Sequence, residues 1–218
     1  GGRLFVGSEA GTLYALDADS GRTEWTFDAD TPIKASPSVD GNRVFAADYA
    51  GQMFSLDATD GKLAWSTDTT KTSPGGDGGF YSSPAVAGGK VFAGRDDGTV
   101  YAFDRNTGKQ SWSFETSGPI YGSPAVAEVP GTPLTVYIGS YDSRLYALDA
   151  ASGKKLWDYD VGGPVPGTAT VIGHTVYTSS FKTVESVGID VLSHRKTFSF
   201  DSPGYTPMIS DGRNLFLI

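Results

Sequence analysis

The chain has 218 residues with 25 Asp or Glu against 17 Lys or Arg, a formal net charge of −8, and no cysteine. The acidic balance argues against a general nucleic-acid binder, which needs a basic face, and against electrostatic docking on anionic lipid. The lack of cysteine excludes disulfides and cysteine-based zinc sites, and no apolar run approaches the length of a membrane span, so we expect no direct membrane insertion.

Short apolar segments alternate with turns rich in Gly, Asp and Asn along the whole chain. The segment from 33 to 68 shows the pattern most clearly, and there we predict strands A, B, C and D at 33–39, 43–48, 52–57 and 62–68. Strands of about five or six residues between such turns are typical of an antiparallel β-meander. No stretch shows sustained helical periodicity. The sequence therefore predicts an all-β fold.

The same four-strand pattern recurs along the chain. We assign approximate repeats to 1–30, 31–70, 80–117, 118–161 and 164–201, with a partial repeat at 204–218. Each repeat contains a version of aromatic-Ala-x-Asp-x-x-x-Gly-x-x-x-Trp, at 14–25, 54–65, 101–112 and 146–157, and a divergent copy at 187–198. Self-similarity at a period of about 40 to 47 residues, with four strands per unit, predicts a β-propeller of four-stranded antiparallel blades.

Two insertions interrupt the period. Residues 69–80 lengthen a connection from strand D to the next strand A, and residues 128–134 lengthen an A–B hairpin. In a propeller, the D–A and B–C connections share one face and the A–B and C–D connections share the other. We therefore expect the two insertions on opposite faces.

These repeats resemble the pyrroloquinoline-quinone-like propeller repeat over essentially the whole chain, including the tryptophan-docking motif of that family. The resemblance implies that each strand-D Trp packs between the motif Ala and the turn Gly of the neighbouring blade. Carried over by position, it gives docking roles to Trp25, Trp65, Trp112, Trp157, Ala15, Ala102, Ala147, Gly21, Gly61, Gly108 and Gly153. We expect positive φ at these glycines. Gly188, His194 and Phe198 replace Ala, Gly and Trp in the fifth copy, so we expect the last blade to be the least regular.

The family resemblance leaves several functions open. It covers quinoprotein dehydrogenases, which bind the quinone and Ca²⁺, the barrel-assembly-machinery lipoprotein, which is a scaffold without quinone, and secreted or kinase-linked ectodomains. The vicinal cysteines typical of the alcohol dehydrogenases are absent here, and the recurring Asp residues of the motif are periodic turn residues. We predict a non-catalytic, extracytoplasmic binding or scaffold propeller without quinone, Ca²⁺ or other metal. The alternatives are a quinone- and Ca²⁺-dependent dehydrogenase, or a fragment of one, and the sensor ectodomain of a membrane kinase.

One face carries polar and aromatic residues that do not repeat. The B–C turns contribute Glu9, Tyr49, Arg95, Asp96, Asp97, Tyr141, Asp142, Phe181 and Lys182, and the starts of the A strands contribute Lys34, Tyr81, Tyr121 and Tyr205. We predict a ligand or partner site formed by Lys34, Tyr49, Tyr81, Arg95, Tyr121, Tyr141, Lys182 and Tyr205. An aromatic rim with a few cations suits a protein or peptide partner, or an acidic small molecule. The alternative is that these residues only cap a channel mouth.

Two further features concern the histidines and the chain ends. His174 and His194 fall in turns on the other face, where two isolated histidines make a poor metal site. The first and last strands, at 3–7 and 214–218, both match strand B. This redundancy predicts a part of a larger propeller, with eight blades as one option, and open blade edges that favour self-association.

Overall fold

The computed structural model describes residues 2–71, 78–182, 185–201 and 209–216, which form 21 β-strands. These ranges contain no helix long and apolar enough to cross a membrane. The strands group in chain order into six antiparallel sheets, which we call blades 1 to 6. Within the described residues, blades 2 to 5 have four strands each, blade 1 has three and blade 6 has two. The predicted propeller fold is confirmed.

The strands have the following bounds. Blade 1 consists of β1 (Arg3–Gly7), β2 (Thr12–Asp17) and β3 (Thr23–Asp28). Blade 2 consists of β4 (Ser38–Asp40), β5 (Arg43–Ala47), β6 (Gln52–Asp57) and β7 (Leu63–Asp68). Blade 3 consists of β8 (Ala85–Ala87), β9 (Lys90–Gly94), β10 (Thr99–Asp104) and β11 (Gln110–Glu115). Blade 4 consists of β12 (Ala125–Ala127), β13 (Thr135–Gly139), β14 (Arg144–Asp149) and β15 (Lys155–Asp160). Blade 5 consists of β16 (Thr170–Ile172), β17 (Thr175–Ser180), β18 (Glu185–Asp190) and β19 (Lys196–Asp201), and blade 6 of β20 (Ile209–Ser210) and β21 (Leu215–Phe216).

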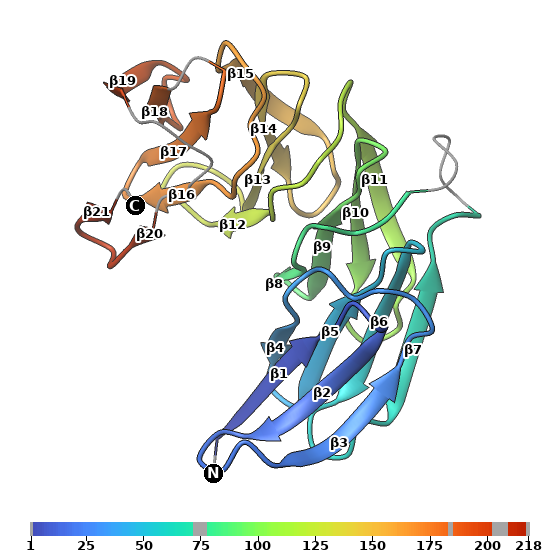
Figure 1. The fold of residues 1–218 in the computed structure, drawn as a ribbon. Coiled ribbons are helices and arrows are strands. Elements are labelled where there is room, and N and C mark those ends of the chain that lie inside the picture. The colour runs from blue at the N-terminus through green and yellow to red at the C-terminus, as the bar shows by residue number, and fades with distance from the viewer. Residues whose placement is uncertain (1, 72–77, 183–184, 202–208, 217–218) are drawn as a thin grey trace.

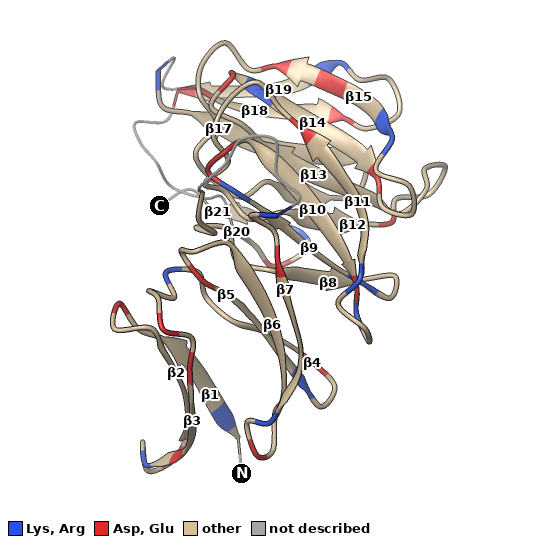
Figure 2. Ribbon diagram, turned by 90° about the vertical axis from the view of Figure 1, so that its right-hand side faces the viewer, with Lys and Arg blue, Asp and Glu red and all other residues tan. Residues whose placement is uncertain are grey.

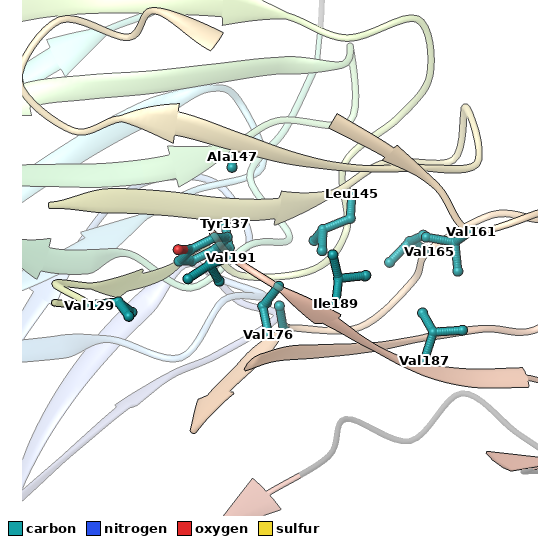
Figure 3. Close-up of a cluster of buried hydrophobic side chains, with 11 residues drawn as sticks. Val129, Tyr137, Leu145, Ala147, Val161, Val165, Val176, Val187, Ile189 and Val191 are labelled. Atoms are coloured by element: carbon teal, nitrogen blue, oxygen red, sulfur yellow. The ribbon is translucent and has the colours of Figure 1, made fainter. Parts of the chain in front are cut away.

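The blades follow one another along an arc (Figure 1). The A strands β4, β8, β12, β16 and β20 lie on its concave side, and the D strands lie on its outer side. Among the described residues, the apolar core is divided into four clusters, each between two adjacent blades. Figure 3 shows the cluster between blades 4 and 5, which includes Tyr137, Leu145, Val176 and Ile189. Each blade is therefore stabilised mainly by its neighbours, as in other repeat proteins.

The A strands are shorter than the sequence pattern predicted. The strand expected at 33–39 is observed as β4, and it begins directly after Pro37. Pro84 and Pro124 precede β8 and β12 in the same way. Proline has no N–H for the strand ladder, so pairing starts only after it.

The residues before these prolines link the blades on the concave side. The backbone N–H of Ser36 donates to the Ser83 hydroxyl at 3.0 Å, and the N–H of Ser83 donates to the Ser123 hydroxyl at 2.9 Å. The N–H of Ser123 continues the series to the Thr168 hydroxyl at 3.0 Å. A short hydroxyl side chain at this position therefore satisfies a backbone N–H of the preceding blade, a role that the sequence analysis did not identify.

Each of the first three tryptophans contacts the next blade. The indole Nε1 groups of Trp25, Trp65 and Trp112 donate to the carbonyls of Ala58, Arg105 and Ala150, at 3.2, 3.0 and 3.1 Å. A Cβ built at Gly61, Gly108 or Gly153 would lie only 2.6, 2.5 or 2.6 Å from the ring of the preceding blade's tryptophan. The turn glycine of one blade thus provides the space that the indole ring of the previous blade fills.

The remaining motif positions are arranged differently. Ala15, Ala102 and Ala147 are the cross-strand register partners of the tryptophan in their own blade. At Gly21, no described heavy atom lies within 4 Å of a built Cβ. Among the described glycines of blade 5, none lies against Trp157, whose ring stacks instead on His194 at that turn position.

The recurring aspartates hold the C–D turns, as the periodicity predicted. In blade 4, the Asp149 carboxylate accepts hydrogen bonds from the backbone N–H and the hydroxyl of Ser152, at 2.8 and 2.6 Å. These bonds lower the pKa of Asp149 below its ordinary value. Asp190 of blade 5 accepts the same pair of bonds from Ser193. The turn glycines have the expected positive φ, and His194 adopts it as well, at 57°. Blade 5 therefore keeps the regular turn despite its divergent sequence.

The two insertions contact different faces, as predicted. Gly79, at the end of the first insertion, donates its N–H to the Asp96 carboxylate in a B–C turn at 2.8 Å. Gly131, in the second insertion, lies near Leu192 in the C–D turn of blade 5, with 3.4 Å between a built Cβ and the leucine side chain.

Candidate functional site

Five aromatic side chains form a continuous row on the face of the B–C and D–A connections. Tyr49, Tyr141 and Phe181 come from the B–C turns of blades 2, 4 and 5, whereas Tyr81 and Tyr121 precede β8 and β12. Successive ring centroids along the row Tyr49–Tyr81–Tyr121–Tyr141–Phe181 are 5.1, 5.2, 4.7 and 5.7 Å apart. We call this row the aromatic strip. It crosses four blades, so residues distant in sequence form one surface.

The rings of the strip contact one another mainly edge to face. The first three pairs have interplanar angles of 74°, 77° and 81°. This arrangement suits the ring quadrupoles and holds each ring in place. Tyr49 and Tyr121 nevertheless keep 38% and 37% of their surface exposed. The strip is therefore a pre-ordered surface with aromatic area available to a partner.

Lys34 supplies a cation at one end of the strip. Its Nζ lies 4.7 Å from the centroid of the Tyr49 ring and 5.3 Å from that of Tyr81, within the range of cation–π attraction. The Glu9 carboxylate is 3.9 Å from the same Nζ, and the Glu9 side chain is 77% exposed. An acidic group of a ligand can therefore approach Lys34 in the place of this exposed glutamate.

The Tyr49 hydroxyl at this end of the strip is bonded to a second tyrosine. Tyr81 donates to the Tyr49 hydroxyl at 3.2 Å. This hydrogen bond and the nearby charges raise the pKa of Tyr49 to about 12. At neutral pH, Tyr49 therefore presents a phenol that donates or accepts hydrogen bonds, and not a phenolate nucleophile.

A cavity of about 290 Å³ adjoins the strip beside Tyr49. It is lined by Tyr49, Ala50, Thr70, Gly78, Gly79 and Asp96. Asp96 was assigned only to a B–C turn by the sequence pattern. Its place in the cavity depends on the contacts of Gly78 and Gly79 with Asp96 and Tyr49, which no local motif reveals.

Arg95 does not lie on the strip, contrary to the prediction. Its side chain is fully buried, donates from Nη2 to the Gly78 carbonyl at 2.7 Å and from Nη1 to the Tyr101 hydroxyl at 3.3 Å, and pairs with the Asp97 carboxylate at 3.3 Å. An arginine at a turn can reach inward because its guanidinium satisfies several acceptors at once. Arg95 fixes the connection before blade 3 and is not available to a ligand.

The other predicted residues divide into three groups. Tyr49, Tyr81, Tyr121, Tyr141 and Lys34 are brought together as described above. Lys182 is exposed and directly follows Phe181, the last ring of the strip. Tyr205 lies outside the described residues. Whether this surface binds a ligand stays a prediction.

The distribution of charged side chains shows where a metal ion such as Ca²⁺ could find ligands. Figure 2 shows Lys and Arg interspersed with Asp and Glu along the turns and outer strands. Within the described ranges, no three His, Asp or Glu side chains gather around a point where a metal ion would sit. Calcium prefers six to eight oxygen ligands, commonly including carboxylates. That the chain binds no quinone or Ca²⁺ stays a prediction.

Solved structures share this fold. BamB from Moraxella catarrhalis superposes with a TM-score of 0.77 at 22% identity, over 94% of this chain and 63% of that chain. The computationally designed Ika8 protein gives 0.79 at 15% identity, over 95% and 62%. A europium-containing methanol dehydrogenase gives 0.72 at 16% identity, over 91% and 49%. The chain thus spans less than two thirds of the length of these proteins, and at such identities the likeness shows the fold alone.

The sequence matches a family model as well. A comparison with curated proteins gave no match. The family model described as "Outer membrane protein assembly factor BamB" matches residues 1–76 and 75–218, which together include every blade. The chain belongs to the family of the outer membrane protein assembly factor BamB.

Proposed function

We propose that this chain is a non-catalytic binding module that holds a polypeptide in extended conformation along the aromatic strip. The observation that carries the proposal is the unbroken series of ring contacts from Tyr49 to Phe181. A partner that follows this series must itself be long and narrow. An extended polypeptide meets this requirement.

The strip suits peptide recognition energetically. Its rings are already held by their neighbours, so they lose little side-chain entropy when a partner binds. Tyrosine offers apolar area together with a hydroxyl that can bond to a peptide backbone. Lys34 adds attraction for an acidic side chain of the partner, because its ammonium is only loosely paired with Glu9 at 3.9 Å.

Membership of the family supports a role in assembly. The family is named after an outer membrane protein assembly factor, and we infer that this chain also works outside the cytoplasm with a protein partner. A scaffold with this role needs a stable recognition surface and no reactive group. The aromatic strip provides such a surface.

The alternative function, a quinone-dependent dehydrogenase, is supported by fewer observations than the binding module. It rests on the fold shared with proteins such as the methanol dehydrogenase. Among the described residues, no group of three or more His, Asp or Glu side chains that could hold a metal ion accompanies the fold. The sensor-ectodomain alternative would need a kinase domain and a membrane span elsewhere in the protein.

Peptides selected from a random display library against the whole chain provide a direct test. The affinity of one selected, dye-labelled peptide is measured by fluorescence anisotropy for three variants. Tyr121→Ala should weaken binding at least about tenfold, or about 1.4 kcal/mol, because it removes a central ring of the strip. Tyr121→Phe should retain most of the affinity. Tyr14→Ala, which alters a half-buried tyrosine of β2 away from the strip, should leave it unchanged.

Equal affinities for Tyr121→Ala and Tyr14→Ala would place peptide binding elsewhere and contradict the proposal.

A second measurement tests the dehydrogenase alternative. A ligand present at a hundred times its dissociation constant stabilises a protein by about 2.7 kcal/mol. We expect no such stabilisation with pyrroloquinoline quinone and Ca²⁺. A saturable rise in the melting temperature would favour the dehydrogenase.

A further inference from the structure

The cavity of about 290 Å³ beside Tyr49 contains a carboxylate whose hydrogen-bonding capacity is only partly used. One oxygen of Asp96 accepts the backbone N–H of Gly79 at 2.8 Å. Among the described residues, the other oxygen accepts no hydrogen bond, and Asp96 has no ion-pair partner. The cavity therefore presents an unpaired, half-buried negative charge to a ligand.

The neighbouring charges do not neutralise this carboxylate. Arg95 precedes Asp96 in the chain, but its fully buried guanidinium pairs with Asp97 at 3.3 Å. The pKa of Tyr49 is raised to about 12, mainly by the hydrogen bond from Tyr81 and in part by the charge of Asp96. The carboxylate is thus close enough to Tyr49 to act on the same ligand.

Two glycines in the wall allow Tyr49 and Asp96 to share one cavity. A Cβ built at Gly78 would lie 2.7 Å from a carboxylate oxygen of Asp96. A Cβ built at Gly79 would lie 2.2 Å from the Tyr49 ring. A side chain at either position would therefore collide with one of the two groups.

An organic cation suits this cavity better than a metal ion. Calcium takes six to eight oxygen ligands, and within the described ranges no three His, Asp or Glu side chains gather at one point. An ammonium or guanidinium group needs only one carboxylate, with an apolar wall for its methylene stem. The Tyr49 ring provides such a wall and adds cation–π attraction. The volume lies near the lower end of small-molecule pockets, about 300–1,000 Å³, and so suits one long side chain.

Tyr49 has one charge of each sign within reach. Lys34 lies 4.7 Å from the centroid of its ring but does not line the cavity, whereas Asp96 does. A polypeptide that follows the aromatic strip therefore meets Lys34 with an acidic side chain and Asp96 with a basic one.

We propose that the cavity beside Tyr49 selects polypeptides by one basic residue, lysine or arginine, whose charged end pairs with Asp96 while its stem packs on the Tyr49 ring. The inference rests on the proposed binding of a polypeptide along the aromatic strip, and it names the residue type that anchors the polypeptide at the Tyr49 end. The rings from Tyr81 to Phe181 offer contact area to many kinds of side chain. This anchor therefore fixes the register in which the polypeptide lies.

Parallel selections from a random peptide display library test the anchor. One selection uses the wild-type chain and the other uses Asp96→Asn, in which asparagine keeps an oxygen for the Gly79 N–H and removes the charge. Peptides selected on the wild type should share Lys or Arg at one aligned position, and peptides selected on Asp96→Asn should not. Asp19→Asn removes the same charge from an exposed C–D turn of blade 1 and should keep the preference.

A lysine peptide from the wild-type selection is then compared with its norleucine counterpart, which keeps the stem and lacks the ammonium. Fluorescence anisotropy should show about fivefold weaker binding of the norleucine peptide to the wild type, the upper range for a partly exposed ion pair. The two peptides should bind Asp96→Asn about equally. In ¹⁵N NMR spectra of the wild type, the amide signal of Gly79, which donates to Asp96, should shift more with the lysine peptide.

The outcomes separate this inference from the proposed function. Selected peptides that lose affinity for Tyr121→Ala but share no basic residue would overturn the anchor and leave the polypeptide site in place. A norleucine peptide that binds the wild type as tightly as the lysine peptide would also overturn the anchor, and this comparison does not require Asp96→Asn to fold. Peptides whose affinity is insensitive to Tyr121→Ala would overturn both proposals. Melting temperatures check the folding of the two asparagine variants.

Discussion

Trp112 of blade 3 lies against Gly153 of blade 4 so closely that a Cβ at Gly153 would be 2.6 Å from the ring. The Trp112 indole also donates to the Ala150 carbonyl in the same turn, at 3.1 Å. Gly153 has a φ of 73°, a conformation that side chains disfavour. The glycine is thus required both by the backbone and by the ring of the neighbouring blade.

The two requirements can be separated by substitution. Gly21 has nearly the same φ, 70°, but no described atom lies within 4 Å of a built Cβ there. Gly153→Ala should therefore cost about 1–3 kcal/mol more than Gly21→Ala, because only the first overpacks an interface. Urea denaturation of both variants gives the difference. Equal losses of unfolding free energy would mean that the backbone conformation alone selects glycine.

The repeats predicted the fold well because their signals are local. Alternation and turn residues recur along the chain, the motif glycine recurs in the first four copies, and each acts within a hairpin or between adjacent blades. The A strands were placed less accurately because the pattern does not show where pairing begins, and Pro37 delays it to Ser38. The serine and threonine hydroxyls on the concave side were missed, since a single Ser before Pro carries no sign of a cross-blade bond.

The candidate site was only partly predictable. Tyr81 and Tyr121 were placed correctly because each precedes an A strand, and the topology brings those strands together. Arg95 was misplaced because a turn position does not determine whether a long side chain points outward or inward. A second cavity, of about 270 Å³ between blades 4 and 5, had no sequence signal except the replacement of the motif glycine by His194, which lines it. Local sequence patterns therefore predict in which turn or strand a residue lies. They do not predict whether its side chain is buried, because burial depends on contacts between blades.

The tryptophans should differ in their contributions to stability. Trp112→Ala should cost about 3–5 kcal/mol, as large aromatic deletions in cores do, because the ring is nearly buried and its Nε1 is bonded. Trp157→Ala should cost less, since Trp157 is half-buried and faces a cavity. Thermal and urea denaturation measure both values. A cost below about 1 kcal/mol for Trp112→Ala would show that its ring is not docked between blades.

The buried pair of Arg95 and Asp97 should be important for the connection before blade 3. Their side chains are 0% and 3% exposed, so Arg95→Met leaves a buried carboxylate without its cation. Loss of one partner from a buried pair typically costs about 3–5 kcal/mol. The double variant Arg95→Met/Asp97→Asn should lose less than the sum of the two single variants. Strictly additive losses in a double-mutant cycle would argue against direct coupling of the two side chains.

Asp149 and Asp48 should influence acid stability in opposite directions. Hydrogen bonds from Ser152 lower the pKa of Asp149 in the folded chain from 3.8. The unfolded chain therefore takes up the proton more readily, and the stability contributed by Asp149 above pH 3.8 is lost as the pH falls through the lowered folded pKa. For Asp48, which is buried, desolvation raises the folded pKa above 3.8 even though Thr31, Ala50 and Gln52 donate hydrogen bonds to the carboxylate. The folded chain favours the protonated form of Asp48. The contribution of Asp48 to the free energy of unfolding therefore declines as the pH rises from 3.8 through the folded pKa.

Two substitutions by asparagine test these signs, because asparagine keeps an acceptor oxygen and removes the titration. Urea denaturation from pH 2 to pH 7 should show a shallower loss of stability below pH 3.8 for Asp149→Asn than for the wild type. Asp48→Asn should show a steeper decline toward acid, because the variant lacks the compensating gain from protonation of the buried carboxylate. The comparison is made between the slopes of the curves, since Asp48→Asn also replaces an acceptor of three hydrogen bonds and so changes stability at every pH. Slopes that change in the same direction for both variants would contradict the assignment, because burial and turn hydrogen bonding act on a carboxylate with opposite sign.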